Sequence, residues 1–595
     1  MLDTKYYDDK QMPLESNSLL KWMWFFVSPF KTKFFLFSIN RIIFFSSFAI
    51  SPFFITKLID FIGSSDFKTN PNIAYNYIIG IGLFILFSAC IGYLRKYEQM
   101  FYDKLKRIFS IFAMSHTMNI QLSWHENQAT GNKIQKIFKS RDSLKDLLRL
   151  FYGEGLRFIV NIVVIFTVIS LNASFIFIIF IFLYILSFLI LAILTGKKQG
   201  KIEDIVNIFF EDVMGKIYEF ASSIITVKFF GLQKFVKNKT IEVETIQMEN
   251  TSKLFHTIQT RWVILNGFAA LGFMLISIFA IHERILGTIS TGVLIMIIWY
   301  TREVWGLVDS IGDIYETFIG DKNGFMRLVE QLKIPKEKLD FVEFKDFPKN
   351  FKKMKFENVY FGYGEKNTLK NINLEIKSGE KIALVGKSGA GKSTFTKLLS
   401  KQFIVDSGNI YIDNIDIKNI EKLSITKHSS IVLQDTELFN ISIKDNILLD
   451  FDGSEKEKNQ VVQNALKMSH SNIFVDKLVD KEDTIIGERG VKLSGGEKQR
   501  IGIARAIARN AEIIIFDEAT SSLDTESERE IQKAMGEIFE GKTAFIIAHR
   551  LSTIKDVDRI LVFDNGQIVE DGNFQELLSI KDGYFAKLWN MQKLD

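Results

Sequence analysis

The chain has 595 residues, of which 47% are hydrophobic, and its mean hydropathy of +0.12 is unusual for a protein with a large soluble part. The apolar surplus lies before about residue 312, and an ordinary soluble mixture follows it. The net charge of only +5, from 74 basic and 69 acidic residues, gives no reason to expect nucleic acid as a partner, and the single cysteine, Cys90, excludes a disulfide or a cysteine-based metal site within one chain.

Six apolar stretches occupy the first half of the chain, and each approaches the roughly 20 residues that a helix needs to cross a bilayer. We expect a cytoplasmic segment over residues 1–33 and an all-α transmembrane domain over residues 34–325. Helices buried in a large soluble core are the alternative, which is strongest for the first stretch because charged residues interrupt it. The stretches cover residues 34–62, 73–94, 156–171, 175–194, 262–281 and 289–308.

The charges of the loops predict how these stretches are oriented. Lysine and arginine are abundant after the second and fourth stretches, whereas the loops on the opposite side are short and nearly uncharged. By the positive-inside rule, the basic segments and both termini are cytoplasmic. Apolar residues keep helical spacing in these segments, so the helices should extend beyond the bilayer as far as breaks near residues 124–131 and 226–231.

Ionisable side chains in and after the sixth stretch have two interpretations. Trp305, Asp309 and Gly312 share one helical face, with Arg302 and Glu303 just above it. An ionisable residue within a membrane needs a cavity or a partner. This face therefore lines a central cavity, or it has a plainer explanation, namely salt bridges between helices or a helix that already lies outside the bilayer.

A change of composition marks the end of the membrane part. Residues 326–353 include a stretch of alternating charges with Pro335 and Pro348, which is typical of a linker. From residue 354 to residue 595, short apolar strands alternate with helices, as expected for an α/β domain. Tyr363 follows the first of these strands, where its ring could stack on a base or simply pack on the surface.

The strongest chemical signal is a glycine-rich loop between an apolar strand at residues 382–385 and a helix. Free backbone N–H groups in such a loop bind phosphate together with the helix dipole. Lys392 would reach the β- and γ-phosphates, and the Ser393 hydroxyl would bind Mg²⁺. We therefore predict a nucleotide site rather than a chance glycine turn. The loop consists of Gly386, Lys387, Ser388, Gly389, Ala390, Gly391, Lys392, Ser393 and Thr394.

A second nucleotide signal lies further along the chain. Residues 513–516 are an unbroken apolar run, typical of a strand buried on both faces. Asp517 and Glu518 follow at its carboxyl end, where ligands bind in open α/β sheets. Asp517 suits a contact with the metal through water, and Glu518 suits the general base that holds the attacking water.

A third anion-binding segment lies between these two. Ser494, Gly495 and Gly496 precede a helix and present free N–H groups, for which the chain itself has no evident phosphate partner. The run LSGGEKQR, at residues 493–500, lies between the phosphate loop and an IIIFDEATSSLD stretch. In this context it resembles the signature of ATP-binding-cassette transporters. Six spans followed by one cassette is the layout of exporter half-transporters in that family.

The resemblance implies roles for further residues. Tyr363 matches the aromatic residue that stacks on the base, and Gln434 matches the glutamine that contacts Mg²⁺ and the attacking water. Asp524 matches a residue of the loop that crosses the dimer interface, and His549 matches the histidine that contacts the γ-phosphate. Glu488 lies in a loop that resembles the segment just before the signature in exporters.

The same resemblance implies a dimer of half-transporters, with a homodimer expected and a heterodimer left open. Two cassettes would enclose two ATP molecules, each held by one chain's phosphate loop and by Ser494 and Gly496 of the other. Turns near residues 124–130 and 222–231 resemble the two coupling helices of such exporters. Glu497 stands where the family more often has glutamine.

We therefore predict ATP-driven export, or flipping between leaflets, of a small amphipathic substrate by alternating access in the bacterial inner (plasma) membrane. ATP and Mg²⁺ are the expected cofactors, and the lipid bilayer is an expected partner. A soluble ATPase of the cassette type would lack the six spans, and an ATP-gated channel would be expected to carry a degenerate site or a regulatory insert. Drugs, lipids, peptides and metal conjugates all remain open as substrates.

Overall fold

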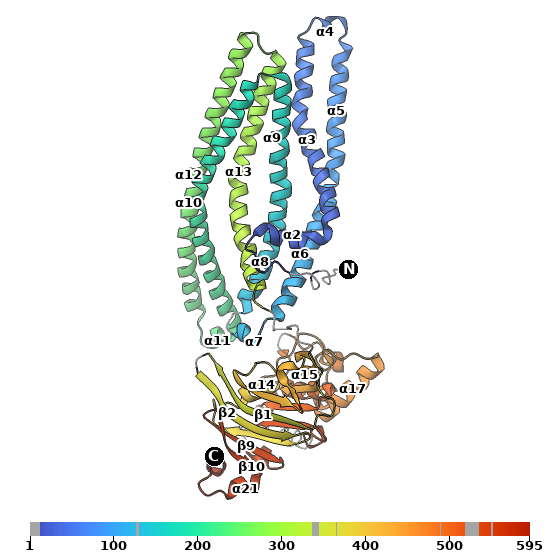
Figure 1. The fold of residues 1–595 in the computed structure, drawn as a ribbon, viewed down its shortest axis with the longest axis vertical. Coiled ribbons are helices and arrows are strands. Elements are labelled where there is room, and N and C mark those ends of the chain that lie inside the picture. The colour runs from blue at the N-terminus through green and yellow to red at the C-terminus, as the bar shows by residue number, and fades with distance from the viewer. Residues whose placement is uncertain are drawn as a thin grey trace. The chain divides into compact units, whose positions relative to one another are not determined.

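A computed structural model of the chain describes residues 7, 12–126, 130–335, 344–364, 366–487, 490–517, 535–548 and 551–594. The chain forms two compact units, Met1–Lys338 and Leu339–Asp595. The first unit is made of long helices, and the second combines strands with shorter helices (Figure 1). This confirms the predicted class, a helical membrane domain followed by an α/β domain.

The predicted apolar stretches all lie within long helices of the first unit. Five helical runs are long and apolar enough to cross a membrane, judged by length and composition over the described residues. The sixth predicted stretch lies at the start of α13 and is not one of these five, so a crossing there stays a prediction. The main helices are α2 (Leu19–Val27), α3 (Lys31–Ile62), α5 (Asn72–Tyr93), α6 (Arg95–Met118), α8 (Thr130–Arg149), α9 (Leu156–Asn172), α10 (Phe175–Ser222), α12 (Gln233–Ile285) and α13 (Thr291–Leu332).

Helix α10 has apolar residues both on the face that packs against other helices and on the face that no helix covers. Phe177 and Phe188 are fully buried against α12 and α13, whereas Phe175, Phe182 and Ile190 face outward. A helix that is hydrophobic on all sides is stable when its outer face contacts lipid. The apolar residues that no helix covers are therefore expected to face the bilayer.

The helices continue past the apolar stretches, as their helical spacing predicted. Helix α10 runs on to Ser222, and α12 begins at Gln233, well before the fifth apolar stretch. A short helix, α11 (Ile224–Phe229), joins them, and another, α7 (Leu122–Glu126), follows α6. These short helices lie at the two predicted breaks, of which residues 127–129 are outside the described part. A coupling role for either helix stays a prediction.

Charged residues that interrupt the first apolar stretch are paired with other helices. Arg41 donates from Nε and Nη2 to the two carboxylate oxygens of Glu98 on α6, at 2.8 and 2.9 Å, and both side chains are buried. Near the other end of α3, Asp60 accepts from Ser290 Oγ at 2.7 Å and from the backbone N–H of Gly292 at 2.8 Å. The second pairing places a carboxylate at the positive end of the α13 dipole.

Trp305 makes an interhelical contact. Its Nε1 donates to Asn266 Oδ1 on α12 at 3.0 Å, and its ring lies 6.0 Å from that of Phe273. This contact joins two helices but is not a salt bridge, so it does not decide between the interpretations of the sixth stretch. The surroundings of Asp309 and Gly312 are not described, so the cavity remains a prediction for them.

The second unit contains two sheets. Strands β1 (Lys353–Tyr363), β2 (Lys366–Lys377), β4 (Ser407–Ile412) and β5 (Ile415–Asp416) form an antiparallel sheet in the order β2-β1-β4-β5. The larger sheet has the order β10-β9-β3-β8-β7-β6, in which only β10 is antiparallel to its neighbour. Its strands are β3 (Lys381–Gly386), β6 (Ser429–Val432), β7 (Ile513–Asp517), β8 (Thr543–Ile547), β9 (Arg559–Asp564) and β10 (Gln567–Gly572).

Helices cover the larger sheet and explain its unbroken apolar strands. Residues at the centres of β3, β7 and β8 are almost completely buried, as expected for parallel strands with helices on both faces. Phe347 and Phe351 also pack into this core, although composition placed their segment in the linker. The helices of this unit are α14 (Lys392–Leu399), α15 (Lys422–His428), α16 (Ile443–Leu448), α17 (Glu455–Met468), α18 (Asn472–Val475), α19 (Gly495–Arg509), α21 (Phe574–Ser579) and α22 (Tyr584–Leu594), of which α16 and α17 pack on α19.

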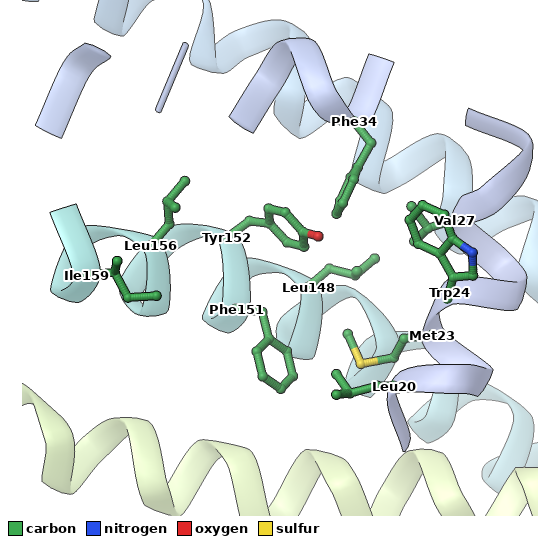
Figure 2. Close-up of a pocket in the computed structure, with 10 residues that line it drawn as sticks. All are labelled: Leu20, Met23, Trp24, Val27, Phe34, Leu148, Phe151, Tyr152, Leu156 and Ile159. Carbon is green, nitrogen blue, oxygen red and sulfur yellow. The ribbon is translucent and has the colours of Figure 1, made fainter. Parts of the chain in front are cut away.

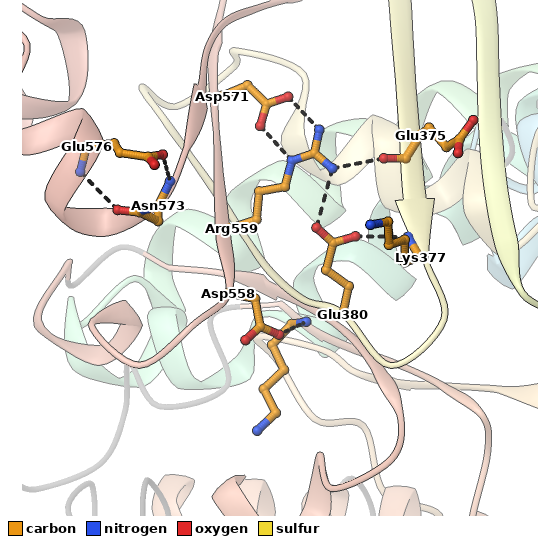
Figure 3. A network of polar contacts seen from close by, with 9 residues as sticks. Glu375, Lys377, Glu380, Asp558, Arg559, Asp571, Asn573 and Glu576 are labelled. Atoms are coloured by element: carbon orange, nitrogen blue, oxygen red, sulfur yellow. Dashed lines mark hydrogen bonds and ion pairs between the residues drawn. The ribbon is translucent and has the colours of Figure 1, made fainter.

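A polar network centred on Arg559 ties the edge of the larger sheet to the end of β2 (Figure 3). The Arg559 guanidinium donates to both carboxylate oxygens of Asp571 on β10 at 2.6 Å, and to the carbonyl oxygen of Glu375 at 2.8 Å. It also pairs with Glu380 at 3.3 Å. The hydrogen bonds that the Asp571 carboxylate accepts raise the pKa of Arg559, so this side chain stays charged.

We expect Arg559→Met to lower the free energy of unfolding by about 1–3 kcal/mol, because Asp571 and Glu380 would lose a half-buried charged donor. Denaturant unfolding of the full chain in detergent measures this change. The control is Lys355→Met, which breaks an exposed pair with Glu357 on the other sheet and should leave the midpoint unchanged. Equal shifts for the two variants would show that the Arg559 network adds nothing beyond a surface pair.

Candidate nucleotide-binding site

Several predicted site residues lie at one edge of the larger sheet. Strands β6, β7, β8 and β3 are parallel neighbours, so their carboxyl ends meet at the same edge. Asp517 ends β7, Gln434 follows β6 by two residues, and the glycine-rich loop follows β3. The chain therefore collects the loop, a carboxylate and an amide at the place where open α/β sheets bind ligands.

Close packing explains why two positions of the loop require glycine. Gly386 has φ +150°, and a Cβ there would lie 2.2 Å from the carbonyl oxygen of Phe563 on β9. Gly391 has φ +108° and begins α14, and a Cβ there would meet Leu369 at 2.8 Å. Gly389, with φ +78°, instead has open space where its Cβ would be. Gly386 and Gly391 therefore let the loop pack closely against its neighbours, and Gly389 leaves room for a phosphate to approach the backbone.

Lys392 is held inside this loop. Its side chain is buried, and Nζ donates to the carbonyl oxygens of Gly386 at 2.8 Å and Lys387 at 3.0 Å. The ammonium group is therefore oriented by the same backbone that would wrap a phosphate. The next residue, Ser393, is exposed, so its hydroxyl can reach a metal ion, whereas Thr394 is buried.

Tyr363 belongs to an aromatic cluster beside α14. It is 45% exposed at the end of β1, and its ring packs edge-on against Phe361 and Phe403 at 5.2 and 5.4 Å. Lys397 of α14 lies 5.8 Å from the centre of the Tyr363 ring. The cluster fixes the tyrosine ring near the loop while leaving part of it available for stacking. Sequence reasoning did not include Phe403, which carries no motif.

The signature segment caps its own helix. Ser494 precedes α19, its Oγ accepts from the backbone N–H of Glu497 at 3.3 Å, and Glu497 Oε2 accepts from the Ser494 N–H at 2.7 Å. This is a capping box, a role that glutamine also fills. The departure at Glu497 therefore keeps the local structure. Ser494 and Gly495 are exposed and Gly496 is half-buried, so the segment is open to an anion from outside the unit.

Four residues that were predicted to act at this site lie outside the described part of the chain. They are Glu488, Glu518, Asp524 and His549. Their roles stay predictions. Glu518 directly follows Asp517 in the sequence, and His549 follows β8 by two residues, so both are attached to strands whose ends are described.

The structure adds a residue that sequence reasoning missed. Asn446 on α16 is fully buried, accepts from the Phe439 N–H at 2.9 Å and donates to the Phe439 carbonyl oxygen at 3.0 Å. Arg505 on α19 donates from Nε to the Asn446 carbonyl oxygen at 2.9 Å. Nearby, a Cβ on Gly502 would meet Thr436 at 2.8 Å. These contacts hold the segment after Gln434 against the signature helix.

We expect Asn446→Leu to lower the free energy of unfolding by about 1–3 kcal/mol, because both backbone groups of Phe439 would lose their hydrogen bonds to the buried Asn446 side chain. We also expect ATP turnover to fall more than ATP affinity, since the Gln434 segment would lose its fixed position. Thermal unfolding and ATPase kinetics of the purified protein measure the two effects. Asn459→Leu, at an exposed position on α17, is the control and should change neither value.

Comparison with known proteins agrees with this architecture. Residues 36–304 match the family model of the ABC transporter transmembrane region, and residues 369–521 match that of the ABC transporter. An ATP-dependent lipid A-core flippase of Desulfotalea psychrophila is 32% identical over 507 residues, which are 82% of this chain and 84% of that protein. A Legionella pneumophila protein of the same name is 30% identical over 606 residues, 98% of each chain.

The structure is also similar to that of a bacterial Atm1-family ABC exporter with ATP bound. The TM-score is 0.86 at 25% identity, and the match covers 93% of this chain and 97% of that one. Both the helical unit and the cassette are therefore shared with solved and curated members of one family. This chain belongs to the ABC transporters as an exporter-type half-transporter, an integral membrane protein that joins one transmembrane region to one ATP-binding cassette and couples ATP hydrolysis to export.

Proposed function

We propose that this half-transporter forms a homodimer that moves an amphipathic lipid between the leaflets of a bacterial inner membrane. The observation that carries this substrate class is the full-length similarity to a protein named as a lipid A-core flippase. The basic segments after the second and fourth apolar stretches support a cytoplasmic location for the cassette. The apolar outer face of α10 over residues 175–194 supports direct contact with lipid.

The cassette would bind ATP through its loop and the residues around it. The loop N–H groups and Lys392 would hold the phosphates, and Tyr363 would stack on the base. Hard oxygen donors suit Mg²⁺, and Ser393, Gln434 and Asp517 offer a hydroxyl, an amide and a carboxylate at the same edge of the sheet. When bound, Mg²⁺ would neutralise charge on the phosphate oxygens.

Hydrolysis would use residues that follow the same parallel strands. Glu518 would accept a proton from the attacking water, and Gln434 would orient that water. His549 would contact the γ-phosphate. In the sequence, Glu518, Gln434 and His549 closely follow β7, β6 and β8, three neighbouring parallel strands fixed by a buried core, which supports a site that is organised before ATP arrives.

Binding would close two cassettes on each other. The exposed Ser494 and Gly495, with Gly496, are free to meet the phosphates held by a second copy, and Asp524 would lie at that seam. ATP favours the closed state because only that state completes its contacts, and hydrolysis removes the contacts again. Closure would draw together the short helices α7 and α11 of the two copies and switch the helices from inward- to outward-facing.

The proposal is tested with protein reconstituted in vesicles that contain a fluorescent lipid A-core analogue. We expect ATP to move the analogue between leaflets and the analogue to stimulate ATP hydrolysis, with Glu518→Gln as the inactive control. An amphipathic drug and a peptide, tested in parallel, should not compete with the lipid. If the drug stimulates ATP hydrolysis and the lipid analogue does not, the chain would be assigned to drug export instead.

A further inference from the structure

A pocket of about 440 Å³ lies between the first short helix and the helices on either side of it (Figure 2). Helix α2 forms one wall, Phe34 of α3 forms another, and the end of α8 and the start of α9 form the third. The volume is within the range of small-molecule sites. The lining residues are Leu20, Met23, Trp24, Val27, Phe34, Leu148, Phe151, Tyr152, Leu156 and Ile159.

The pocket opens to the outside through its apolar rim. Leu20 is 62% exposed, Trp24 53% and Ile159 60%, while Leu148 at the back is almost fully buried. The opposite face of α2 is anchored in the core, where Trp22 and Phe26 are completely buried. A helix that is anchored on one side and exposes leucine and tryptophan on the other is typical of a segment lying in the membrane interface.

Two hydrogen-bond donors lie in this otherwise apolar pocket. Tyr152 faces Phe34, with a distance of 3.8 Å between ring centres, and its hydroxyl points towards the side of the pocket where Trp24 lies (Figure 2). Over the described part of the chain, neither the Tyr152 hydroxyl nor Trp24 Nε1 has a hydrogen-bond acceptor. Tyr152 belongs to a π-helical turn, Leu150–Gly155, a rare feature that is frequent at functional sites.

The chain around the pocket is exclusively basic on the α2–α3 side. No acidic residue occurs between Glu15 and Asp60, whereas Lys21, Lys31 and Lys33 occur there and are exposed. Among the described residues none of these three lysines forms an ion pair, in contrast to Arg149 and Arg157, which pair with acids three positions earlier in the chain. The three lysines are within three positions of residues that line the pocket.

We propose that this pocket binds one acyl chain of an anionic phospholipid from the membrane leaflet, with the lipid phosphate held by Lys31 and Lys33. The apolar walls suit the hydrocarbon, the Tyr152 hydroxyl and Trp24 Nε1 suit ester oxygens, and the unpaired lysines suit the phosphate. This site rests on the predicted position of α3 and α9 in the membrane. It does not depend on which substrate the transporter exports, because none of its residues belongs to the face of α13 that was considered for the substrate cavity.

The test uses the full chain in phosphatidylcholine vesicles that contain a trace of phosphatidylglycerol with a photoreactive acyl chain. After illumination, mass spectrometry should find the label on peptides from α2 and from residues 148–159. The same acyl chain on phosphatidylcholine should label these peptides less. At probe levels below saturation, Lys31→Gln with Lys33→Gln should lower the labelling by about fivefold for each lysine. The matched control is Lys197→Gln with Lys198→Gln, two exposed lysines on α10.

A second pair of variants separates the pocket from the general lipid surface. Leu156→Trp should fill the pocket and remove the label, whereas Ile190→Trp, on the outward face of α10, should leave it unchanged. A thermal unfolding transition like that of the wild type shows that each variant is folded.

Three outcomes would overturn the proposal. The first two are labelling that Leu156→Trp leaves unchanged and labelling that is equal for phosphatidylglycerol and phosphatidylcholine. The third is labelling that appears only after residues 1–11 are deleted, because the chain's own N-terminal segment would then be the occupant. Labelling needs no ATP turnover, so its failure is distinct from a failure of transport.

Discussion

Glu518→Gln is expected to lower the rate of ATP hydrolysis by about 10²- to 10⁴-fold, the contribution typical of a general base. The glutamine amide keeps the shape of the glutamate but cannot accept the proton of the attacking water. ATP affinity should stay within about twofold of wild type, since Lys392 and the loop, which would hold the phosphates, are unchanged. A phosphate-release assay and titration with a fluorescent ATP analogue measure the two quantities.

The same variant should also trap the closed dimer. Because ATP stays intact, the contacts that favour closure persist, and the two cassettes should remain associated in ATP and Mg²⁺. Crosslinking between a cysteine at position 494 of one chain and a cysteine at position 389 of the other would detect the closed state, once Cys90 is replaced. A variant that keeps the wild-type hydrolysis rate would contradict the assignment of Glu518.

Glu512→Gln is the matched control for this experiment. Glu512 precedes β7, so the same chemical change is made at the opposite end of the strand that leads to Glu518. Glu512 pairs with His428 at 3.2 Å, away from the carboxyl edge of the sheet. We expect little change in hydrolysis from this variant. A comparable loss in both variants would mean that the strand, rather than the carboxylate of Glu518, is being disturbed.

Local patterns were enough to predict the elements that build the nucleotide site. The unbroken apolar runs before Gly386 and Asp517 predicted two buried strands, and the structure confirms them as β3 and β7. The glycine-rich loop and the helix after it, α14, were predicted from the residues that follow the first of these strands. The sequence could not predict that β8 lies between these strands, because the order of strands depends on contacts between segments more than a hundred residues apart.

Contacts over long separations also explain what sequence reasoning missed. Asn446 has no motif, and its importance comes from a pairing with Arg505, 59 residues away. Phe347 and Phe351 lie among charged residues that resemble a linker, and only the folded sheet shows that both are buried. The pocket beside α2 combines three separate segments in the same way. Each of these features depends on contacts between residues that are far apart in the sequence.

Lys392→Ala is expected to weaken ATP binding by about 10- to 100-fold, since a hydrogen bond to a charged partner contributes about 1.5–3 kcal/mol. The buried ammonium group already points into the loop, where it donates to Gly386 and Lys387, so the change removes a charge that is fixed in place. Hydrolysis at saturating ATP should fall as well, because the γ-phosphate would lose a stabilising cation. Equilibrium binding and phosphate release on the full chain measure both.

The affinities of Lys392→Ala for ATP, ADP and AMP show whether the variant has lost only the lysine charge or whether the loop is distorted. A lysine that contacts the β- and γ-phosphates predicts a large loss of affinity for ATP, a smaller one for ADP and almost none for AMP. A distorted loop would weaken all three equally, because the Lys392 ammonium also bonds two backbone carbonyls. Lys418→Ala is the control, since Lys418 likewise donates to a carbonyl oxygen, that of Gly408 at 3.2 Å, away from the loop. Unchanged ATP affinity in Lys392→Ala would rule out the loop as the phosphate cradle, whatever the family resemblance implies.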